Sequence, residues 1–268
     1  MTPNDPFAAV SVLPRVVDAA ASARAAVDAA LAHNLMRRRS AEVTAEAGLR
    51  SARATAALEG ADYRLDQVRR FSAPQDYDPD ASILAGALRL SGELGSVATT
   101  FERAPLQALA KLHLLAATGT VKPDWLGRPR SDDDGEELLG LPLAPAAAHV
   151  ADRLSILAQL LVEKTAAPAL VVSAIVHGEI LALRPFTWGN GMVARAAARL
   201  VLVSRGLDVK AVTSPEVGHA EDPAAYADAA RAYIAGDVAA WIVHCAHAVE
   251  LGARETLAIC AAIERAPA

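Results

Sequence analysis

Aromatic side chains are scarce in this chain: Phe, Tyr and Trp make up 4% of its 268 residues, although 53% of the residues are hydrophobic. The core must therefore be built from Ala, Leu and Val, in helical patterns. No stretch of convincing length alternates between apolar and polar residues, as a half-buried β-strand would. The sequence predicts an all-α protein that is long enough to bury a sizeable core.

Cysteine and clustered basic residues are also rare. Cys245 and Cys260 are the two cysteines, and we interpret them as buried thiols on one helix in a reducing cytoplasm. The formal net charge is −5 and the one dense basic run is Arg37–Arg39, which argues against nucleic-acid binding. The longest apolar run, 166–176, is too short to span a bilayer. We expect a cytoplasmic protein with no nucleic-acid or membrane partner.

Glycine and polar residues are concentrated in one segment, 183–195, between two helical patterns. Pro185 ends the first helix because it lacks an N–H group and disfavours the α conformation in the preceding residue. Gly189-Asn190-Gly191 can turn tightly and approach a ligand closely, and the apolar spacing after it predicts a second helix. Free N–H groups at the positive end of that helix predict an anion-binding site.

This segment is similar to the signature of the Fic (Fido-domain) proteins, most of which transfer AMP from ATP. The family signature reads His-x-Phe-x-(Asp or Glu)-Gly-Asn-Gly-(Arg or Lys)-x-x-Arg. Five residues match it at the right spacing: Phe186, Gly189, Asn190, Gly191 and Arg195. The resemblance implies a Fic-type helical domain and assigns nucleotide or anion binding to these five residues.

Three positions depart from the signature: Arg184 replaces the catalytic His, Trp188 the metal-binding acid and Met192 a phosphate-binding Arg. Arg184 cannot act as a base because a guanidinium stays protonated, and a positioned base typically contributes about 10²–10⁴-fold in rate. Trp188 offers no oxygen to Mg²⁺, and Met192 removes a charge-assisted hydrogen bond to phosphate. We therefore expect no catalytic residue, no Mg²⁺ and no ordinary AMP transfer.

A second match lies upstream, where Thr55, Glu59 and Gly60 fit the (Ser or Thr)-x-x-x-Glu-(Gly or Asn) pattern of the family's inhibitory helix. The resemblance places that helix at about 40–60 and implies a Glu59–Arg195 ion pair. A carboxylate there would neutralise the arginine and occupy the volume of a phosphate. By itself the pattern would be a helix end with a surface Glu, and its position upstream of Gly-Asn-Gly favours a lock.

The resemblance divides the chain into an N-terminal helical region (1–104), a Fic-like domain (105–250) and the end of a C-terminal helix (251–268). The irregular stretch 119–142 corresponds to the hairpin flap that docks the target chain in active Fic proteins, so it could form a short β-hairpin and contact a protein target. Its acidic run, 131–137, lacks the spacing of a calcium loop. We interpret that run as solvated loop.

Apolar spacing and terminal signals predict the helices themselves. Their expected ranges are 14–36, 41–58 with Ser40 as N-cap, 62–71, 80–101, 105–117, 145–164, 168–183, 191 onward, 223–234 and 241 onward.

Several histidines and one cysteine on these helices allow both a structural and a functional interpretation. We interpret His113 and His177 as packed residues, although His177 could replace the missing base. His244, Cys245 and His247 could suggest a metal site, and helix packing is the favoured interpretation.

The leading functional hypothesis is a pseudoenzyme with a Glu59–Arg195 lock, whose pocket binds ATP, another nucleotide or another phosphate-bearing ligand, or is permanently closed by Glu59. One alternative is a transferase with altered chemistry that moves AMP or another phosphate-linked group to a protein hydroxyl. Another is a structural or partner-binding scaffold, for example a homodimer. Trp188 would either stack on a base or plug the pocket, and the sequence leaves both open.

Overall fold

The computed structural model describes residues 5–73 and 76–265, and within these ranges the chain forms helices joined by loops, with no β-strand. An isolated bridge between Thr118 and Val121 is the nearest approach to β-structure in the described chain. The all-α architecture predicted from the sequence is confirmed.

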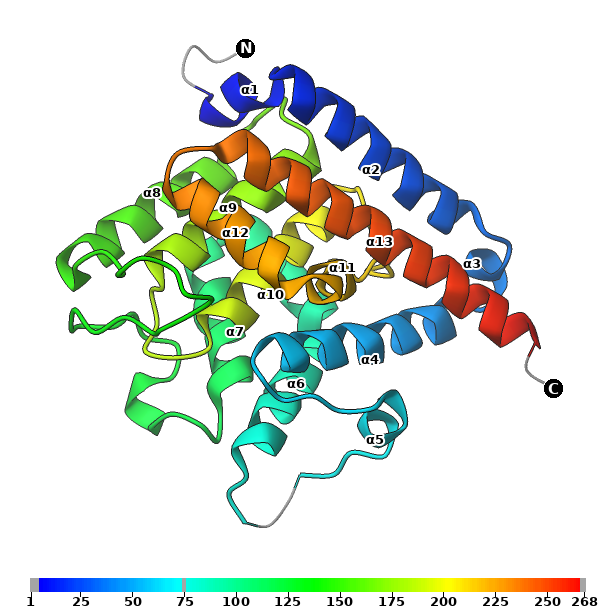
Figure 1. Cartoon of the computed structure of the whole chain (residues 1–268), viewed down its shortest axis with the longest axis horizontal. Helices are drawn as coiled ribbons and strands as arrows, with labels where there is room; N and C mark the ends of the chain where they lie inside the picture. The colour runs from blue at the N-terminus through cyan, green and yellow to red at the C-terminus, as the bar shows by residue number, and fades with distance from the viewer. Residues whose placement is uncertain (1–4, 74–75, 266–268) are drawn as a thin grey trace.

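The N-terminal part of the chain forms helices that pack around and below the centre of the molecule (Figure 1). They are α1 (Pro6–Ser11), α2 (Pro14–Ala32), α3 (Leu35–Arg38), α4 (Ser40–Leu58), α5 (Leu65–Arg69) and α6 (Pro79–Arg103). The single helix predicted over 14–36 is wrong, because the chain leaves helical geometry at His33 and starts again. The N–H of Leu35 donates to Nδ1 of His33 at 3.3 Å. Ser40 is also not a cap: it is the first helical residue, and Arg39 precedes the helix.

The remaining helices supply the centre of the fold, and the last of them runs just below α2 (Figure 1). They are α7 (Pro105–Ala117), α8 (Val150–Val162), α9 (Ala169–Leu183), α10 (Asn190–Ser204), α11 (Pro215–Glu221), α12 (Pro223–Ile234) and α13 (Val238–Arg265), with 3₁₀ turns η1 (Pro123–Trp125) and η2 (Ala147–His149). Cys245 and Cys260 both lie buried on α13, as predicted.

The helix predicted from Pro145 begins later, because the backbone at Pro145 serves another contact. The carbonyl of Pro145 accepts from the guanidinium of Arg130, and Ala146 is extended, with φ −55° and ψ 145°. A 3₁₀ turn then leads into α8 at Val150. The predicted start at 145 is therefore wrong by five residues, and those residues belong to the long loop that precedes α8.

Helix α9 is apolar on nearly all sides and is almost entirely buried, as a central helix should be. Helix α10 packs against α9, α6 and α7, so the anion-binding turn between α9 and α10 lies next to the core. Helix α4 packs along α6 and α11, which brings its end at Glu59 to the start of α10. Helix α13 runs beside α2 along the upper right of the molecule (Figure 1).

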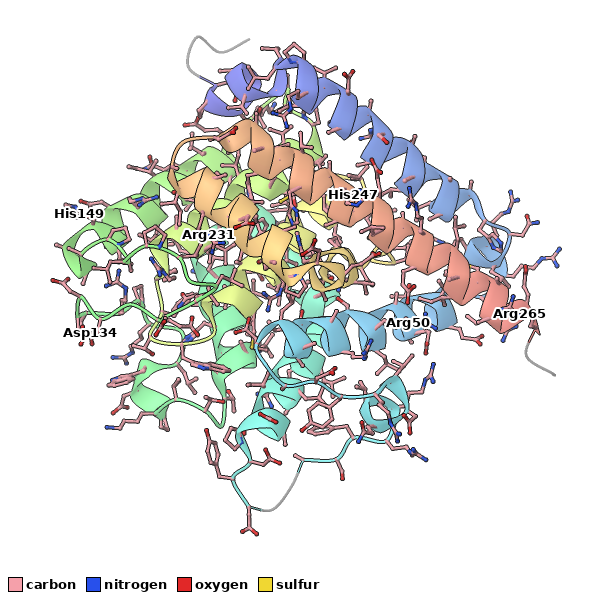
Figure 2. All side chains as sticks on the ribbon, viewed as in Figure 1. Arg50, Asp134, His149, Arg231, His247 and Arg265 are labelled. Atoms are coloured by element: carbon pink, nitrogen blue, oxygen red, sulfur yellow. The ribbon has the colours of Figure 1, made fainter. Side chains whose placement is uncertain are left out.

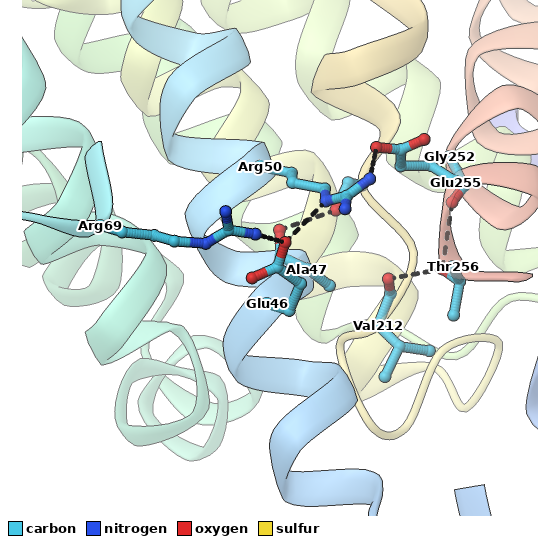
Figure 3. A network of polar contacts seen from close by, with 9 residues as sticks. Glu46, Ala47, Arg50, Arg69, Val212, Gly252, Glu255 and Thr256 are labelled. Atoms are coloured by element: carbon cyan, nitrogen blue, oxygen red, sulfur yellow. Dashed lines mark hydrogen bonds and ion pairs between the residues drawn. The ribbon is translucent and has the colours of Figure 1, made fainter. Parts of the chain in front are cut away.

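A chain of charged side chains holds α4 between α5 and α13 (Figure 3). Oε1 of Glu46 accepts from Arg69 at 2.5 Å and from Arg50 at 3.0 Å, and Arg50 also donates to Glu255 of α13 at 2.5 Å. Next to it, the hydroxyl of Thr256 donates to the carbonyl of Val212 at 2.8 Å. Contacts between side chains therefore fix α4 along its length, upstream of Glu59.

In the described part of the chain, every helix is either too short or too polar to cross a bilayer.

Candidate functional site

The turn between α9 and α10 has left-handed backbone at both of its ends. Arg184 follows α9 with φ 42° and ψ 66°, and Gly189 precedes α10 with φ 77° and ψ 18°. A left-handed residue ends a helix, and the proline after Arg184 prevents its continuation. Glycine adopts this geometry without steric cost, which explains Gly189 at the start of the second helix. The backbone N–H groups of Gly189 and Asn190 are thereby free to bind an acceptor.

Asn190 closes this turn from within and is fully buried. Its Oδ1 accepts from the N–H of Phe186 at 2.9 Å, and its Nδ2 donates to the carbonyl of Phe186 at 2.8 Å. The ring of Phe186 stacks on His113 of α7, with centroids 4.1 Å apart and planes 3° apart. Asn190 and Phe186 therefore fix the shape of the anion-binding turn against the core.

The predicted ion pair between Glu59 and Arg195 is present. Nη2 of Arg195 lies 2.5 Å from Oε1 of Glu59, and the two side chains are 2% and 8% exposed. Burial lowers the pKa of Arg195, and the attraction of Glu59 more than offsets it, so that the pKa lies above its usual value. Nε of Arg195 is buried without an acceptor among the described residues. The guanidinium therefore stays charged and keeps a donor for a further oxygen.

The end of α4 is built to present Glu59. Gly60 has φ 94°, and the N–H groups of Gly60 and Ala61 donate to the carbonyls of Ala57 and Ala56 at 3.0 and 2.9 Å. This is a Schellman motif, which favours glycine at the left-handed position. Thr55 contacts Arg195 through its carbonyl oxygen, at 3.4 Å. The upstream motif thus forms the helix end that was expected, with Glu59 directed at α10.

Glu136, from the acidic run, occupies the anion-binding turn. Its Oε1 accepts from the N–H of Gly189 at 2.8 Å, and its Oε2 accepts from the N–H and Nδ2 of Asn190 at 2.8 and 2.7 Å. The interpretation of the whole run as solvated loop is therefore wrong at Glu136. It holds for neighbours such as Asp134, which is exposed at the rim of the molecule (Figure 2).

The electrostatics of Glu136 are unfavourable in spite of these three hydrogen bonds. Burial raises its pKa, repulsion by the Glu59 carboxylate raises it further, and the bonds from Asn190 and Gly189 offset only part of this. The pKa of Glu136 therefore lies above its usual value. Two carboxylates thus lie close together in this site: Glu136 binds the N–H groups at the start of α10, and Glu59 binds Arg195.

Arg184, which stands where the signature has His, contacts the same loop. Its Nη2 donates to the carbonyl of Pro142 at 2.5 Å, and its Nη1 donates to the carbonyl of Glu136 at 3.4 Å. The side chain is 3% exposed. Burial and the nearby Arg130 lower the pKa of Arg184, and Glu136 opposes the shift. Arg184 therefore serves as a hydrogen-bond donor to backbone carbonyls.

The other two replaced positions contribute to packing. Met192 is fully buried, and its Cε lies 3.2 Å from where a Cβ on Gly86 of α6 would be. Trp188 is half-buried and packs against the main hydrophobic core. Neither side chain supplies an oxygen or a positive charge to the site.

Residues 119–142 form no β-hairpin. The segment contains the 3₁₀ turn η1 and otherwise irregular backbone. Arg130 explains this arrangement, because its N–H and guanidinium bind three consecutive carbonyls where α9 passes into the anion-binding turn: Pro185 at 2.8 Å, Arg184 at 2.9 Å and Leu183 at 3.5 Å. These bonds direct the loop toward the site, and no partner strand is available for a hairpin.

His177 and His244 lie with His219 in an aromatic cluster beside Arg195, whereas His113 stacks on Phe186 and the side chain of His247 is 62% exposed. Nε2 of His177 lies 2.8 Å from the Tyr226 hydroxyl, and Nδ1 of His219 lies 3.1 Å from Nε2 of His244. The indole of Trp241 lies against His177 with centroids 5.0 Å apart. Burial lowers the pKa of His244 to about 4 and keeps His177 and His219 neutral. Within the described residues, no group of three or more His, Cys, Asp or Glu side chains has the arrangement of a metal site.

Glu136 and Arg130 are the functional residues that sequence reasoning missed. Glu136 lies in a run of five acidic residues, and nothing local distinguishes it from Glu137. Arg130 lies between Pro129 and the acidic run, in a polar stretch where an arginine is usually solvated. The positive φ of Leu139, 54°, and the glycines around it shape the loop, but the sequence does not show which side chain it would turn inward.

Comparison with solved structures identifies the fold. A Fic family protein from Desulfovibrio desulfuricans G20 superposes with a TM-score of 0.77 at 20% identity, over 96% of this chain and 77% of that one. A fragment of Fic-1 from C. elegans superposes with a TM-score of 0.69 at 18% identity, over 92% of this chain and 73% of that one. No protein-family model and no curated protein matches the sequence. At these identities the similarity shows the fold, and the activity must be argued from the site.

Proposed function

We propose that this chain, which has the fold of Fic family proteins, is a pseudoenzyme whose pocket binds a phosphate-bearing ligand, a nucleotide first, under a Glu59–Arg195 lock. The buried pair of Glu59 and Arg195 carries this proposal. A guanidinium that is 2% exposed and faces a carboxylate at 2.5 Å is a preformed oxyanion receptor. Together with the N–H groups of Gly189 and Asn190, it offers donors for two neighbouring anionic groups.

The same geometry argues against AMP transfer. A transferase needs a base on the attacking hydroxyl, and Arg184 remains protonated while it donates to the carbonyls of Pro142 and Glu136. His177, the other candidate, is fully buried among Tyr226, His219 and Trp241. A base must reach the proton that it removes, and the contacts of His177 lie within that cluster. These observations support a binding function.

The donors in the pocket do not suit Mg²⁺, which prefers oxygen ligands. Trp188 replaces the family's acid, and both oxygens of Glu136 already accept N–H groups. We therefore expect ligand binding to be independent of Mg²⁺. The ligand charge would be balanced by Arg195 and by the start of α10.

Thermal unfolding with ATP, ADP and Mg²⁺ tests the proposal, on the wild-type chain and on Glu59→Gly. A ligand that binds only the folded state at about 100 times its Kd adds about 2.7 kcal/mol, which is a shift of several degrees for a chain of this size. Glu59→Gly should show a larger shift than wild type, because Arg195 is then free. Asn190→Ala in the same background is the matched control and should abolish the shift.

The outcomes separate the hypotheses. If a nucleotide raises the unfolding temperature of Glu59→Gly more than that of the wild-type chain, the result would support a locked pocket. Absence of a shift in both proteins would refute the nucleotide function and leave a structural scaffold. Transfer of label from ATP to protein, lost in Asn190→Ala, would instead point to a transferase with altered chemistry.

A further inference from the structure

Residues 131–144 form a loop whose two ends are joined at its base. The guanidinium of Arg130 donates to the carbonyls of Asp132 at 2.6 Å and of Pro145, so one side chain spans the beginning and the end of the loop. Arg130 is 4% exposed and also binds the α9–α10 turn. The base is therefore fixed, whereas most of the residues beyond it are exposed. A compact loop with closely spaced ends is a common form for a functional surface segment.

The polar contacts that hold the loop on the body are ones that a ligand or solvent could replace. They are the Glu136 carboxylate on Gly189 and Asn190, the Arg184 guanidinium on the carbonyls of Pro142 and Glu136, and the Arg231 guanidinium of α12 on the carbonyl of Leu139 at 3.0 Å. Leu138, 7% exposed, is buried in the core, and Leu139 and Leu141 are partly buried against it. Figure 2 shows Arg231 on α12, facing the loop region.

The carboxylate of Glu136 makes the hydrogen bonds that a phosphate oxygen would make at a helix start. It does so next to a second carboxylate, Glu59, which repels it. An anion supplied by the chain thus occupies the position that the proposed ligand needs. Glu136 and a ligand phosphate cannot occupy these N–H groups together, so the ligand must displace the loop or at least its carboxylate.

From this we infer that residues 131–144 are a lid that the chain holds closed with its own anion, the Glu136 carboxylate, and with Arg184 as the latch. The identity of the competing ligand rests on the proposed function; the lid itself rests on the contacts above. Arg184 thereby has a role of its own: its guanidinium binds two main-chain carbonyls of the lid and holds the lid over the pocket. Glu59 and Glu136 then close the pocket from two different segments of the chain.

Hydrogen–deuterium exchange of the full chain, read by mass spectrometry over 131–144, tests the lid without any ligand. Glu136→Gln keeps the shape but removes the charge and places an NH₂ group where an acceptor is needed. Loss of these charge-assisted bonds should speed exchange of the Gly189 and Asn190 amides, which donate to Glu136, by about tenfold or more, and exchange of the protected lid amides should rise with it. Glu137→Gln, at the exposed neighbouring residue, is the matched control and should exchange as wild type does.

Arg184→Lys gives a second test, since lysine keeps the charge but lacks the planar fork that reaches two carbonyls. It should also speed exchange of the lid while the rest of the chain stays protected. If the lid amides of both Glu136→Gln and Arg184→Lys exchange as slowly as those of the wild-type chain, the inference is overturned.

Sodium pyrophosphate and ADP, added to the wild-type chain and to Glu136→Gln, separate this inference from the proposed function. Faster lid exchange in the wild type with either probe, and tighter binding by Glu136→Gln, would support both. Faster exchange in Glu136→Gln alone, with no response to either probe in either protein, would support the lid and refute the phosphate-binding function. Binding of a probe with the lid still protected in all proteins would support the function and refute the lid.

Discussion

A Cβ atom placed on Gly191 would lie 2.5 Å from Oε1 of Glu59 and 3.2 Å from Nη1 of Arg195. Because Gly191 has no side chain, it leaves room for the Glu59 carboxylate that pairs with Arg195. Gly191 and Glu59 are 132 residues apart in the sequence, and the carboxylate of Glu59 occupies the space that a side chain on residue 191 would need.

Gly191→Ala should consequently weaken the lock. The new methyl group must push the Glu59 carboxylate away from Arg195, and overpacking of a buried site typically costs about 1–3 kcal/mol. Urea unfolding measures the effect. Gly92→Ala is the control, because nothing lies within 4 Å of a Cβ added at Gly92 on α6, and removing a helical glycine there should stabilise by about 0.4–1 kcal/mol. Equal effects of the two substitutions would contradict the steric argument.

Acid should destabilise the fold through its buried neutral histidines. The pKa values of His113 and His244 are lowered to about 4, and those of His177 and His219 lie well below normal. A lowered folded pKa means that the unfolded chain binds more protons below about pH 6.5, so stability is lost as the pH falls toward 4. Each neutral histidine contributes up to about 1.4 kcal/mol per pH unit in that window.

Urea unfolding between pH 7 and pH 4.5 checks this, and the slope counts the protons taken up. Glu136 and Asp208, whose pKa values burial raises, act in the opposite direction and offset part of the slope. A stability that stays level across this range would show that the histidines are hydrated or protonated in the fold.

The Arg50–Glu255 pair, which couples α4 to α13, should be stronger than the exposed Arg39–Glu42 pair at the start of α4. Its side chains are 21% and 26% exposed, against 47% and 48% for Arg39–Glu42. Double-mutant cycles with alanine should give about 0.5–1 kcal/mol for Arg50–Glu255 and about 0.2–0.5 kcal/mol for Arg39–Glu42. A larger value for the exposed pair would mean that the network in Figure 3 does not hold α4.

Arg184→His restores the family's catalytic residue but should not restore AMP transfer. Trp188 and Met192 are still in place, and Glu59 and Glu136 still occupy the donors. The variant loses charge-assisted hydrogen bonds to Pro142 and Glu136, so it should unfold about 1.5–3 kcal/mol more easily. Denaturant unfolding and a label-transfer assay with ATP measure the two effects. Transfer of label by this single variant would refute the pseudoenzyme assignment.

The sequence predicted those parts of the site whose signal is local. The turn at Gly189 follows from glycine geometry, and the Glu59–Arg195 contact follows from two short motifs that resemble known ones. Glu136 could not be found in this way, because its role depends on the path of a loop that Arg130 directs. The start of α8 was misplaced for the same reason: the carbonyl of Pro145 binds Arg130 and is not part of a helix. Contacts between distant loop residues leave no periodicity in the sequence.

The packing of Met192 bears on how this chain could change by mutation. Its side chain fills space beside Gly86 in α6, where an added Cβ would already lie 2.3 Å from the carbonyl of Ala116. Met192→Arg would place a larger, charged side chain in this fully buried position, and overpacking or an unpaired buried charge destabilises a core. A return to the family residue would therefore carry a stability cost before it brought any gain in phosphate contact.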